Sequence, residues 1–135
     1  MDEYYRAVRA LPTWLAAPLA QLPAQTVVHI QELRLRTDCA VTFTVQGRQC
    51  SASALPGCPP ALVAMRLDAL QIEEIFHTLC NGSVHTHERE LSEGYLTTAA
   101  GNRVGVAGQF VQREGQCITL QKVTSLNLRI ARSCY

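Results

Sequence analysis

The sequence predicts an α+β fold, in which an N-terminal helix and a central pair of helices accompany small antiparallel sheets. Three observations support this class. Between Leu11 and Leu22 apolar residues recur at intervals of three and four, the spacing of one helix face. A second pattern of this kind follows Asp68. From Ile30, and again after Gly94, apolar residues instead alternate with polar ones, which indicates strands with one buried face.

The N-terminal helix has one apolar face and almost no charge. That face consists of Leu11, Trp14, Leu15, Pro18, Leu19 and Leu22. Pro12 suits a helix start, and Pro18 is expected to kink or shorten the helix. Two interpretations stay open, because the helix can pack on its own sheet or dock on a partner. The prolines argue against a membrane-spanning helix, and the acidic start at Asp2 and Glu3 argues against a secretory signal.

The first set of strands begins with a clear alternation. Leu33 and Leu35 alternate with charged residues, so Glu32, Arg34 and Arg36 share the polar face of one strand. Turn residues then separate two further strands, which gives a meander with one buried face. The turns are expected at 37–38 and 46–48, and the two strands over 41–45 and near Cys50.

A loop rich in proline and glycine, residues 53–60, follows the meander. The chain of 135 residues suits one domain, which can bury roughly two-thirds of its unfolded surface. The loop nevertheless allows a two-part organisation of residues 1–135, split near 53–67.

The central helical pair has clear start and stop signals. Asp68 and Gln71 have the spacing of a capping box, and Asn81-Gly82 suits the left-handed end of the first helix. The apolar stripe of this helix is Ile72, Ile75, Phe76, Leu79 and Cys80. Ser83 is expected to cap a second, largely exposed helix that runs toward Glu93.

The stretch 94–132 contains the second set of strands. Turns are expected at 100–102 and 113–115, with strands over 95–98, 104–110, 118–120 and 126–130. In the last strand the inward positions are apolar, which leaves Asn127 and Arg129 on the opposite side.

Composition excludes several classes. Hydrophobic residues make up 47% and charged residues 17%, which is typical of a globular chain, and the net charge of +1 creates no overall field for nucleic acid. The six cysteines are Cys39, Cys50, Cys58, Cys80, Cys117 and Cys134. No pair has C-x-x-C spacing, so reduced and mostly buried thiols are expected.

No metal or catalytic constellation stands out. His85 and His87 are two positions apart on an expected helix, so they point to different faces, whereas zinc needs three or four convergent ligands. Gly101, Gly105 and Gly108 do not have the spacing of a phosphate-binding loop, and glycines inside a strand more often mark a bulge or a close backbone approach.

The arginines are the better indication of function. The chain has eleven of them and one lysine, and guanidinium groups suit phosphates and carboxylates. Arg34, Arg36, Arg103 and Arg129 lie on expected polar faces or next to a turn. One interpretation is surface arginines with local ion pairs, each worth less than about 1 kcal/mol. The other is that one or more reaches a phosphate held by another domain or subunit.

Three segments resemble, in order and spacing, the N-terminal part of the stage III sporulation protein AA family. They are 30–48, 79–98 and 101–132. The most specific pieces are ELRLR, the run from Ser83 to Tyr95, and RVGVAG with SLNLRIAR. The resemblance covers nearly the whole chain and is weakest before residue 28 and over 51–67.

The resemblance implies that residues 1–135 are a single N-terminal, non-catalytic domain. Members of the family are ATPases similar to the motors of type II and type IV secretion, whose N-terminal domain has the fold expected here. They are implicated in the channel joining mother cell and forespore. Their ATPase domain, which implies ATP and Mg²⁺, follows the equivalent of Arg132. The chain alone is therefore expected to have no catalytic residue, no metal, no cofactor and no ATPase activity.

The resemblance also implies roles for residues and partners. In related secretion ATPases this domain packs on the ATPase domain of a neighbour in a ring, where arginines approach the nucleotide. The candidates for contact with nucleotide phosphates in trans are Arg34, Arg36 and Arg103, and the interface candidates are Arg129, Asn127 and Glu32. One departure precedes Arg103, where the family's proline-glycine-glycine-histidine turn is Ala99-Ala100-Gly101-Asn102.

The implied partners are the ATPase domain of the parent protein or of a neighbouring subunit in a ring homo-oligomer, and membrane channel proteins of the sporulation complex, with no nucleic acid. The implied location is the mother-cell cytoplasm, with a peripheral position at the membrane allowed. Two alternatives stay open: a free-standing adaptor that binds a channel component without contacting nucleotide, and a small enzyme that uses the cysteines.

Overall fold

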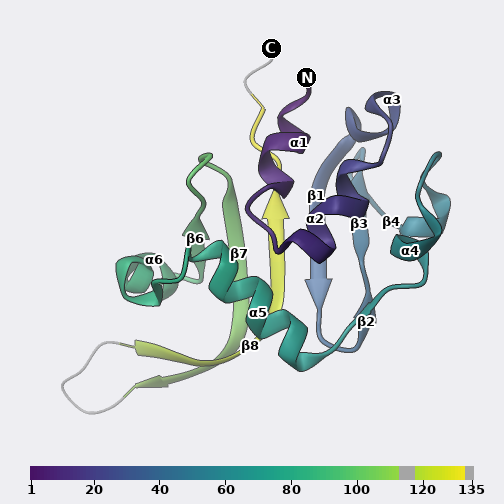
Figure 1. Cartoon of the computed structure of the whole chain (residues 1–135). Helices are drawn as coiled ribbons and strands as arrows, with labels where there is room; N and C mark the ends of the chain where they lie inside the picture. The colour runs from purple at the N-terminus through teal and green to yellow at the C-terminus, as the bar shows by residue number, and fades with distance from the viewer. Residues whose placement is uncertain (113–117, 133–135) are drawn as a thin grey trace.

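The computed structural model of the chain describes residues 1–112 and 118–132. Its α+β fold confirms the predicted class (Figure 1). The helices are α1 (Glu3–Val8), α2 (Thr13–Ala20), α3 (Ala24–Val27), α4 (Pro60–Val63), α5 (Ala69–Leu79) and α6 (Glu88–Leu91), with 3-10 turns η1 (Ala52–Ala54) and η2 (Val84–His87). The strands are β1 (Ile30–Arg36), β2 (Cys39–Ala40), β3 (Thr42–Val45), β4 (Arg48–Ser51), β5 (Arg66–Leu67), β6 (Tyr95–Thr97), β7 (Arg103–Gln112) and β8 (Ile118–Arg129).

The two predicted sets of strands join in one six-stranded sheet, with strand order β4-β3-β1-β8-β7-β6. Strand β1 lies between β3 and β8, so Leu33 is opposite both Phe43 and Leu128. All of these pairs are antiparallel, and β2 and β5 form a small second sheet. Residues on both sides of the segment 53–67 therefore belong to the same sheet, while a division of the chain near this segment stays a prediction.

One correction concerns β8, which is a single strand of 12 residues where two strands were expected. The register against β7 shifts between Ala107 and Gly108 and again between Gln109 and Phe110. Bulges of this kind change which side chains face inward, and this interrupts the simple alternation along the sequence. The predicted turn at 113–115 lies outside the described residues.

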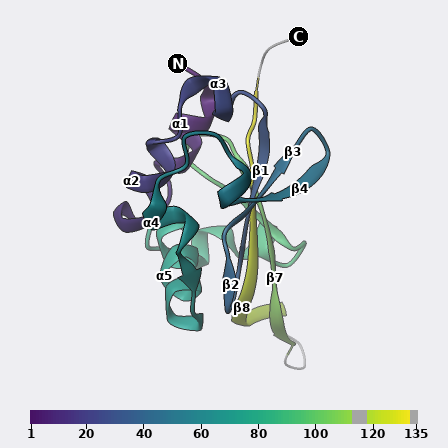
Figure 2. The ribbon, with the colours of Figure 1, turned by 90° about the vertical axis from the view of Figure 1, so that its right-hand side faces the viewer.

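The helices α1, α2, α4 and α5 lie to one side of the strands, as Figure 2 shows. The core between the layers includes Leu15, Leu19, Leu33, Leu35, Phe43, Ile72, Ile75, Leu126 and Leu128, each with no exposed surface. We call the other side, which these helices leave uncovered, the open face of the sheet. Within the described residues no helix is long and apolar enough to cross a membrane.

The N-terminal helix is shorter than its apolar repeat. It begins after Pro12 and ends at Ala20, with Pro18 inside its last turn. The helices α1 and α3 were not predicted, because six and four residues are too short for a periodic pattern. Side-chain contacts fix α1 instead, since Tyr4 Oη donates to the carbonyl of Leu19 over 2.8 Å.

The signals of the central helix are confirmed. Asp68 Oδ1 accepts from the Gln71 amide at 2.8 Å, and Gln71 Oε1 accepts from the Asp68 amide at 2.9 Å. Asn81 and Gly82 have φ of 57° and 80°, so the helix ends in the left-handed region. The prediction that Ser83 caps the next helix is wrong. Its side chain makes no capping bond, because the segment opens as the 3-10 turn η2, while its carbonyl accepts from the Thr86 hydroxyl.

Candidate functional site on the open face of the sheet

All six residues singled out in the sequence lie on β1, β7 or β8, and their side chains belong to the open face. Strand alternation explains this placement, because Leu33 and Leu35 of β1 and Leu126 and Leu128 of β8 are buried on the helical side. The residues between or beside these apolar positions therefore face the other way. They are Glu32, Arg34 and Arg36 on β1, Arg103 on β7, and Asn127 and Arg129 on β8.

Arg34 lies in the middle of a row that crosses all six strands, since Thr42 of β3 is itself opposite Ser51 of β4. Arg34 is opposite Thr42 of β3 on one side and Asn127 of β8 on the other. Asn127 is in turn opposite Gly105 of β7, which is opposite Tyr95 of β6. Residues opposite one another on neighbouring strands lie about 5 Å apart at their Cα atoms, so Thr42, Arg34 and Asn127 are direct neighbours, and Gly105 separates them from Tyr95.

Three polar atoms of this row are buried without a hydrogen bond to any part of the chain that the structure describes. They are Arg34 Nε, Thr42 Oγ1 and Asn127 Oδ1. A polar group removed from water without a partner costs about 1–3 kcal/mol. The middle of the open face therefore has hydrogen-bonding capacity that the described residues leave unused.

The next row brings charged residues together. Glu32 is opposite Arg129, and continuing the β7–β8 register by one step places Arg103 opposite Arg129 as well. Arg34 is diagonal to Arg129 across the β1–β8 pair, a position in which the Cα atoms of two residues lie about 7 Å apart. Like charges opposite one another destabilise a sheet, so Arg34, Arg103 and Arg129 form a positive cluster that an anion would stabilise.

Among the described residues, the arginines of this cluster make no ion pair with a carboxylate. Among residues 1–112 and 118–132, Arg132–Asp2 is an ion pair, and His77–Glu73, His85–Glu88 and His87–Glu90 are contacts that become ion pairs only when the histidine is protonated. None involves an arginine of the open face, although Glu32 belongs to the same face. Arg103 has a different contact, since its Cζ atom lies 4.1 Å from the centre of the Tyr95 ring. This cation–π contact holds the guanidinium over the edge of the sheet.

Arg36 lies on the same face as Arg34, on the side away from Arg129. It is opposite Ser125, two residues further along β1 from Arg34, and its side chain is exposed. Arg129 lies at the other end of the shared β1–β8 register, opposite Glu32. The register therefore adds Arg129 and Arg103 on the other side of Arg34, while Arg36 stays its neighbour along β1.

The histidines have local partners. His85 Nδ1 lies 2.9 Å from Glu88 Oε1, and His87 Nδ1 lies 3.3 Å from Glu90 Oε1. The hydroxyl of Thr97 donates to Glu90, and this bond, together with His87, holds the pKa of the Glu90 carboxyl below its usual value despite partial burial. In the described part of the chain no three potential metal ligands cluster together.

The described cysteines do not have the surroundings of an activated nucleophile. Cys39, Cys50, Cys58 and Cys80 are free thiols, and only Cys80 is fully buried, fewer than expected. Burial raises the pKa of the Cys50 and Cys58 thiols, and raises that of Cys80 to about 11. A raised pKa disfavours the reactive thiolate. Cys117 and Cys134 lie outside the described residues.

Sequence reasoning missed part of the site. Thr42 and Tyr95 lie in the central row, and their alternation with buried Phe43 and Leu96 is a signal that predicts this. Arg132 was also missed, because it follows the last strand and belongs to no periodic pattern. Its side chain reaches Asp2 at the other end of the chain.

These features define an α+β domain whose antiparallel sheet is covered by helices on one side and has an arginine cluster on the other. The model of the family described as sporulation stage III, protein AA matches residues 11–135, and the chain belongs to this family. It is 31% identical over 122 residues to stage III sporulation protein AA of Bacillus subtilis (strain 168). The aligned part is 90% of this chain and 36% of that relative, so the chain spans about a third of the relative's length. No solved structure matches the chain.

Proposed function

We propose that this chain is the assembly and nucleotide-sensing domain of a sporulation ATPase of the secretion type. Its open face contacts the phosphates of a nucleotide that is held by the ATPase domain of the parent protein or of a neighbouring subunit in a ring. The protein acts from the mother-cell cytoplasm on the channel to the forespore, together with the membrane proteins of that channel. The chain alone does not hydrolyse ATP.

The observation that supports this function most strongly is the positive cluster Arg34, Arg129 and Arg103. Its guanidinium groups lie within two neighbouring rows of three adjacent strands, and none has a carboxylate partner among the described residues. Guanidinium forks bind phosphate oxygens through two hydrogen bonds at once, and a sheet holds the backbone that carries them in a fixed arrangement. Arg34 Nε, a buried donor at the base of this cluster, has no hydrogen-bond partner among the described residues.

The residues present fit one side of a nucleotide site. Arginines that approach from a neighbouring subunit stabilise phosphate charge, while a phosphate-binding loop and Mg²⁺ hold the nucleotide. In this proposal the ATPase domain supplies the loop and the metal, and the open face supplies only positive charge. Arg34, Arg129 and Arg103 would orient the terminal phosphate, and no step of hydrolysis is assigned to them.

A docking experiment tests the proposal. The chain is mixed with the separately produced ATPase domain of its parent protein, with and without a non-hydrolysable ATP analogue and Mg²⁺, and the affinity is measured. Docking is expected to need nucleotide, and Arg34→Ala or Arg129→Ala should weaken it by at least about tenfold. Arg48→Ala is the matched control, because Arg48 is an exposed strand arginine opposite Val45, on the other side of the sheet.

Two results would contradict this function. If the affinity for the ATPase domain is the same with and without nucleotide, and the arginine variants do not change it, the adaptor is favoured. That adaptor binds a channel component and never contacts nucleotide. ATP turnover that stays with the isolated chain through gel filtration, and is unchanged in Arg34→Ala, would show an enzyme rather than a sensing domain.

A further inference from the structure

The helix α2 has an unusual outer surface. Its sequence, TWLAAPLA, contains no charged residue. Leu15 and Leu19 are buried on the inner side, while Ala17 and Ala20 are exposed and Ala16 is half-buried on the outer side. A helix at the surface of a globular protein normally has charged and polar residues there, and one that is apolar all round is normally covered. The composition of α2 therefore indicates that something packs on its outer side.

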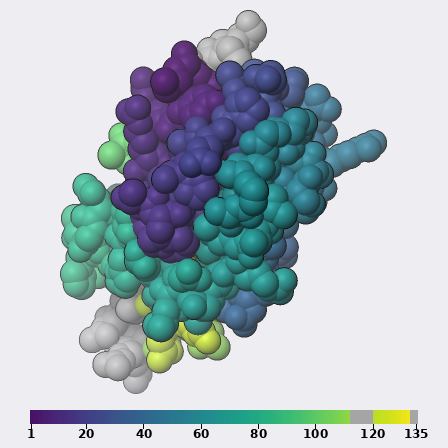
Figure 3. Space-filling model, turned by 45° about the vertical axis from the view of Figure 1, so that its right-hand side comes forward, coloured from purple at the N-terminus to yellow at the C-terminus, as the bar shows by residue number. Residues whose placement is uncertain are grey.

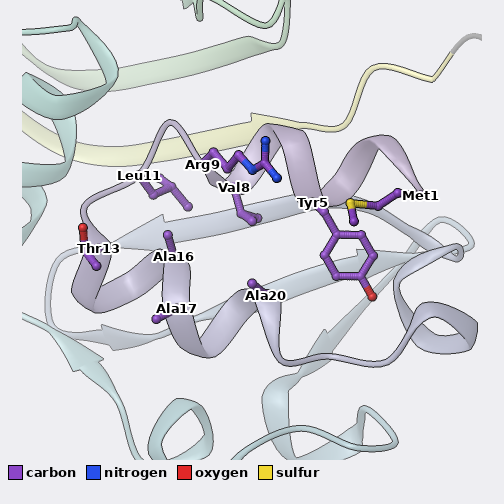
Figure 4. Close-up of a pocket in the computed structure, with 9 residues that line it drawn as sticks. All are labelled: Met1, Tyr5, Val8, Arg9, Leu11, Thr13, Ala16, Ala17 and Ala20. Carbon is purple, nitrogen blue, oxygen red and sulfur yellow. The ribbon is translucent and has the colours of Figure 1, made fainter.

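A groove lies along this surface, between α1 and α2. It has a volume of about 540 Å³ and is lined by Met1, Tyr5, Val8, Arg9, Leu11, Thr13, Ala16, Ala17 and Ala20 (Figure 4). Figure 3 shows the face where the purple and dark-blue N-terminal segment lies beside the teal segment that contains α4 and α5. Because three of the lining residues are alanines, the backbone of an occupant can approach α2 closely.

The walls of the groove are held in place by hydrogen bonds. The hydroxyl of Tyr5 donates to the carbonyl of Leu22 over 2.7 Å, and that of Tyr4 donates to Leu19 over 2.8 Å. Both bonds tie α1 to the end of α2 and the residues that follow it. The groove therefore exists before any partner arrives, which removes part of the ordering cost of binding.

The charge at the groove identifies its occupant. Arg9 is the only charged residue of the lining, and Arg6, three positions earlier, lies on the same side of α1. Both line an adjoining hollow of about 350 Å³ that extends to Thr78 and Ala99. Neither makes an ion pair with any residue of 1–112 or 118–132, although both line a third hollow together with Asp2 and Glu3. An apolar groove with two arginines at its edge is complementary to an apolar segment with a nearby carboxylate.

We propose that the groove between α1 and α2 is the docking site for an amphipathic helix of a partner protein. A large apolar side chain of that helix occupies the space over Ala16, Ala17 and Ala20, and an acidic residue at one end pairs with Arg9 and Arg6. The site lies on the helical side of the sheet and shares no residue with the open face. It therefore goes beyond the proposed nucleotide contact and stands if that contact fails. The family match begins at residue 11, so the wall formed by Met1, Tyr5, Val8 and Arg9 lies outside it.

Two synthetic helices of about 15 residues test this proposal on the full chain. Both have leucines spaced three and four apart; one has two glutamates at an end, and the other has two lysines in their place. Titration calorimetry is expected to show binding of the glutamate peptide at least about tenfold tighter than that of the lysine peptide. Ala17→Glu should weaken this binding by at least about tenfold. Arg9→Glu should reverse the preference between the peptides.

Matched controls keep the result specific. Ala61→Glu changes an exposed helical alanine of α4, and Arg89→Glu reverses an exposed arginine of α6; neither residue lines the groove, and both variants should bind like the wild type. Equal affinity for the two peptides, or unchanged binding by Ala17→Glu with its circular dichroism intact, would overturn the proposal. Self-association of the chain that Ala17→Glu abolishes would also overturn it, because a second copy would then occupy the groove.

Discussion

Arg132 and Asp2 lie 130 positions apart in the sequence and form a two-point ion pair. Arg132 Nη2 is 2.9 Å from Asp2 Oδ1, and Nε is 3.3 Å from both carboxylate oxygens. The same guanidinium donates to the carbonyl of Val27 over 2.7 Å and to that of Ile30. The end of the last strand is thereby tied to the start of α1, the end of α3 and the start of β1.

Replacing Arg132 by alanine should destabilise the domain. Both side chains are less than one-fifth exposed, so the change removes the arginine charge and its hydrogen bonds from a largely buried carboxylate and from two carbonyls. A loss of about 2–3 kcal/mol in the free energy of unfolding is expected from urea denaturation. Arg129→Ala is the control, since this exposed arginine has no ion pair among the described residues, and it should change stability by less than about 0.5 kcal/mol. If Arg132→Ala and Arg129→Ala change the free energy of unfolding equally, the stabilising role of the Arg132–Asp2 ion pair is contradicted.

The ion pair should also make stability depend on pH. Burial by itself raises the pKa of Asp2, but hydrogen bonds from Arg132 and the Tyr4 amide, with the nearby positive charge, outweigh it and hold the pKa below 3.8. A depressed pKa in the folded state contributes stability above the unfolded pKa, and this contribution disappears as pH falls through the folded value. Asp2→Asn should therefore be less stable than the wild type at pH 6, and the difference should shrink below about pH 3.8.

Asparagine is the right replacement because it still caps a helix, so the cap of α1 is kept. Unfolding curves across the acid range measure the difference. In an Arg132→Ala background, Asp2→Asn should cost much less at pH 6, since the partner is already gone. If Asp2→Asn lowers the free energy of unfolding by the same amount at every pH, the charge of the Asp2 carboxylate does not contribute to stability.

Glu73 of α5 should protect the bulged part of β8. Its Oε1 atom accepts from the Val123 amide at 3.1 Å, at the place where the β7–β8 register shifts. Because Glu73→Ala removes this acceptor, it should speed hydrogen exchange at the Val123 amide by at least about tenfold. Glu74→Ala is the neighbouring control, because Glu74 accepts instead from the Trp14 indole at 2.8 Å. Exchange at Val123 that Glu73→Ala leaves unchanged would show that the contact does not protect the bulge.

The sequence predicted local features well and long-range contacts poorly. Alternation around Leu33 placed Arg34 on the polar face of its strand, and the spacing of Asp68 and Gln71 predicted the capping box, because each depends on neighbours in the chain. The pairing of β1 with β8 joins residues about 95 positions apart, and no local pattern specifies it. The same limit explains why Arg103 and Arg129 were separate candidates in the sequence, although the β7–β8 register brings them together.

The two glycines of β7 should respond very differently to a methyl group. At Gly108 a Cβ atom would overlap the carbonyl oxygen of Lys122 and lie 3.0 Å from the Cα atom of Val123, both of which are backbone atoms that cannot rotate away. Gly108→Ala should therefore lower the free energy of unfolding by about 2 kcal/mol or more, since the β7–β8 pair would have to shift. At Gly105 the nearest atom is Asn127 Cβ at 3.8 Å, an ordinary contact.

Gly105→Ala should be neutral or slightly stabilising, because alanine loses less conformational freedom on folding, by about 0.5–1 kcal/mol. Urea denaturation of both variants measures the contrast. Because Gly105 lies beside Asn127 in the central row, the comparison also shows whether a methyl group fits on the open face. If Gly108→Ala and Gly105→Ala lower the free energy of unfolding equally, the bulge does not explain why a glycine is needed at position 108. A large loss confined to Gly108 would establish a structural role there, because the Lys122 carbonyl leaves no room for a Cβ atom.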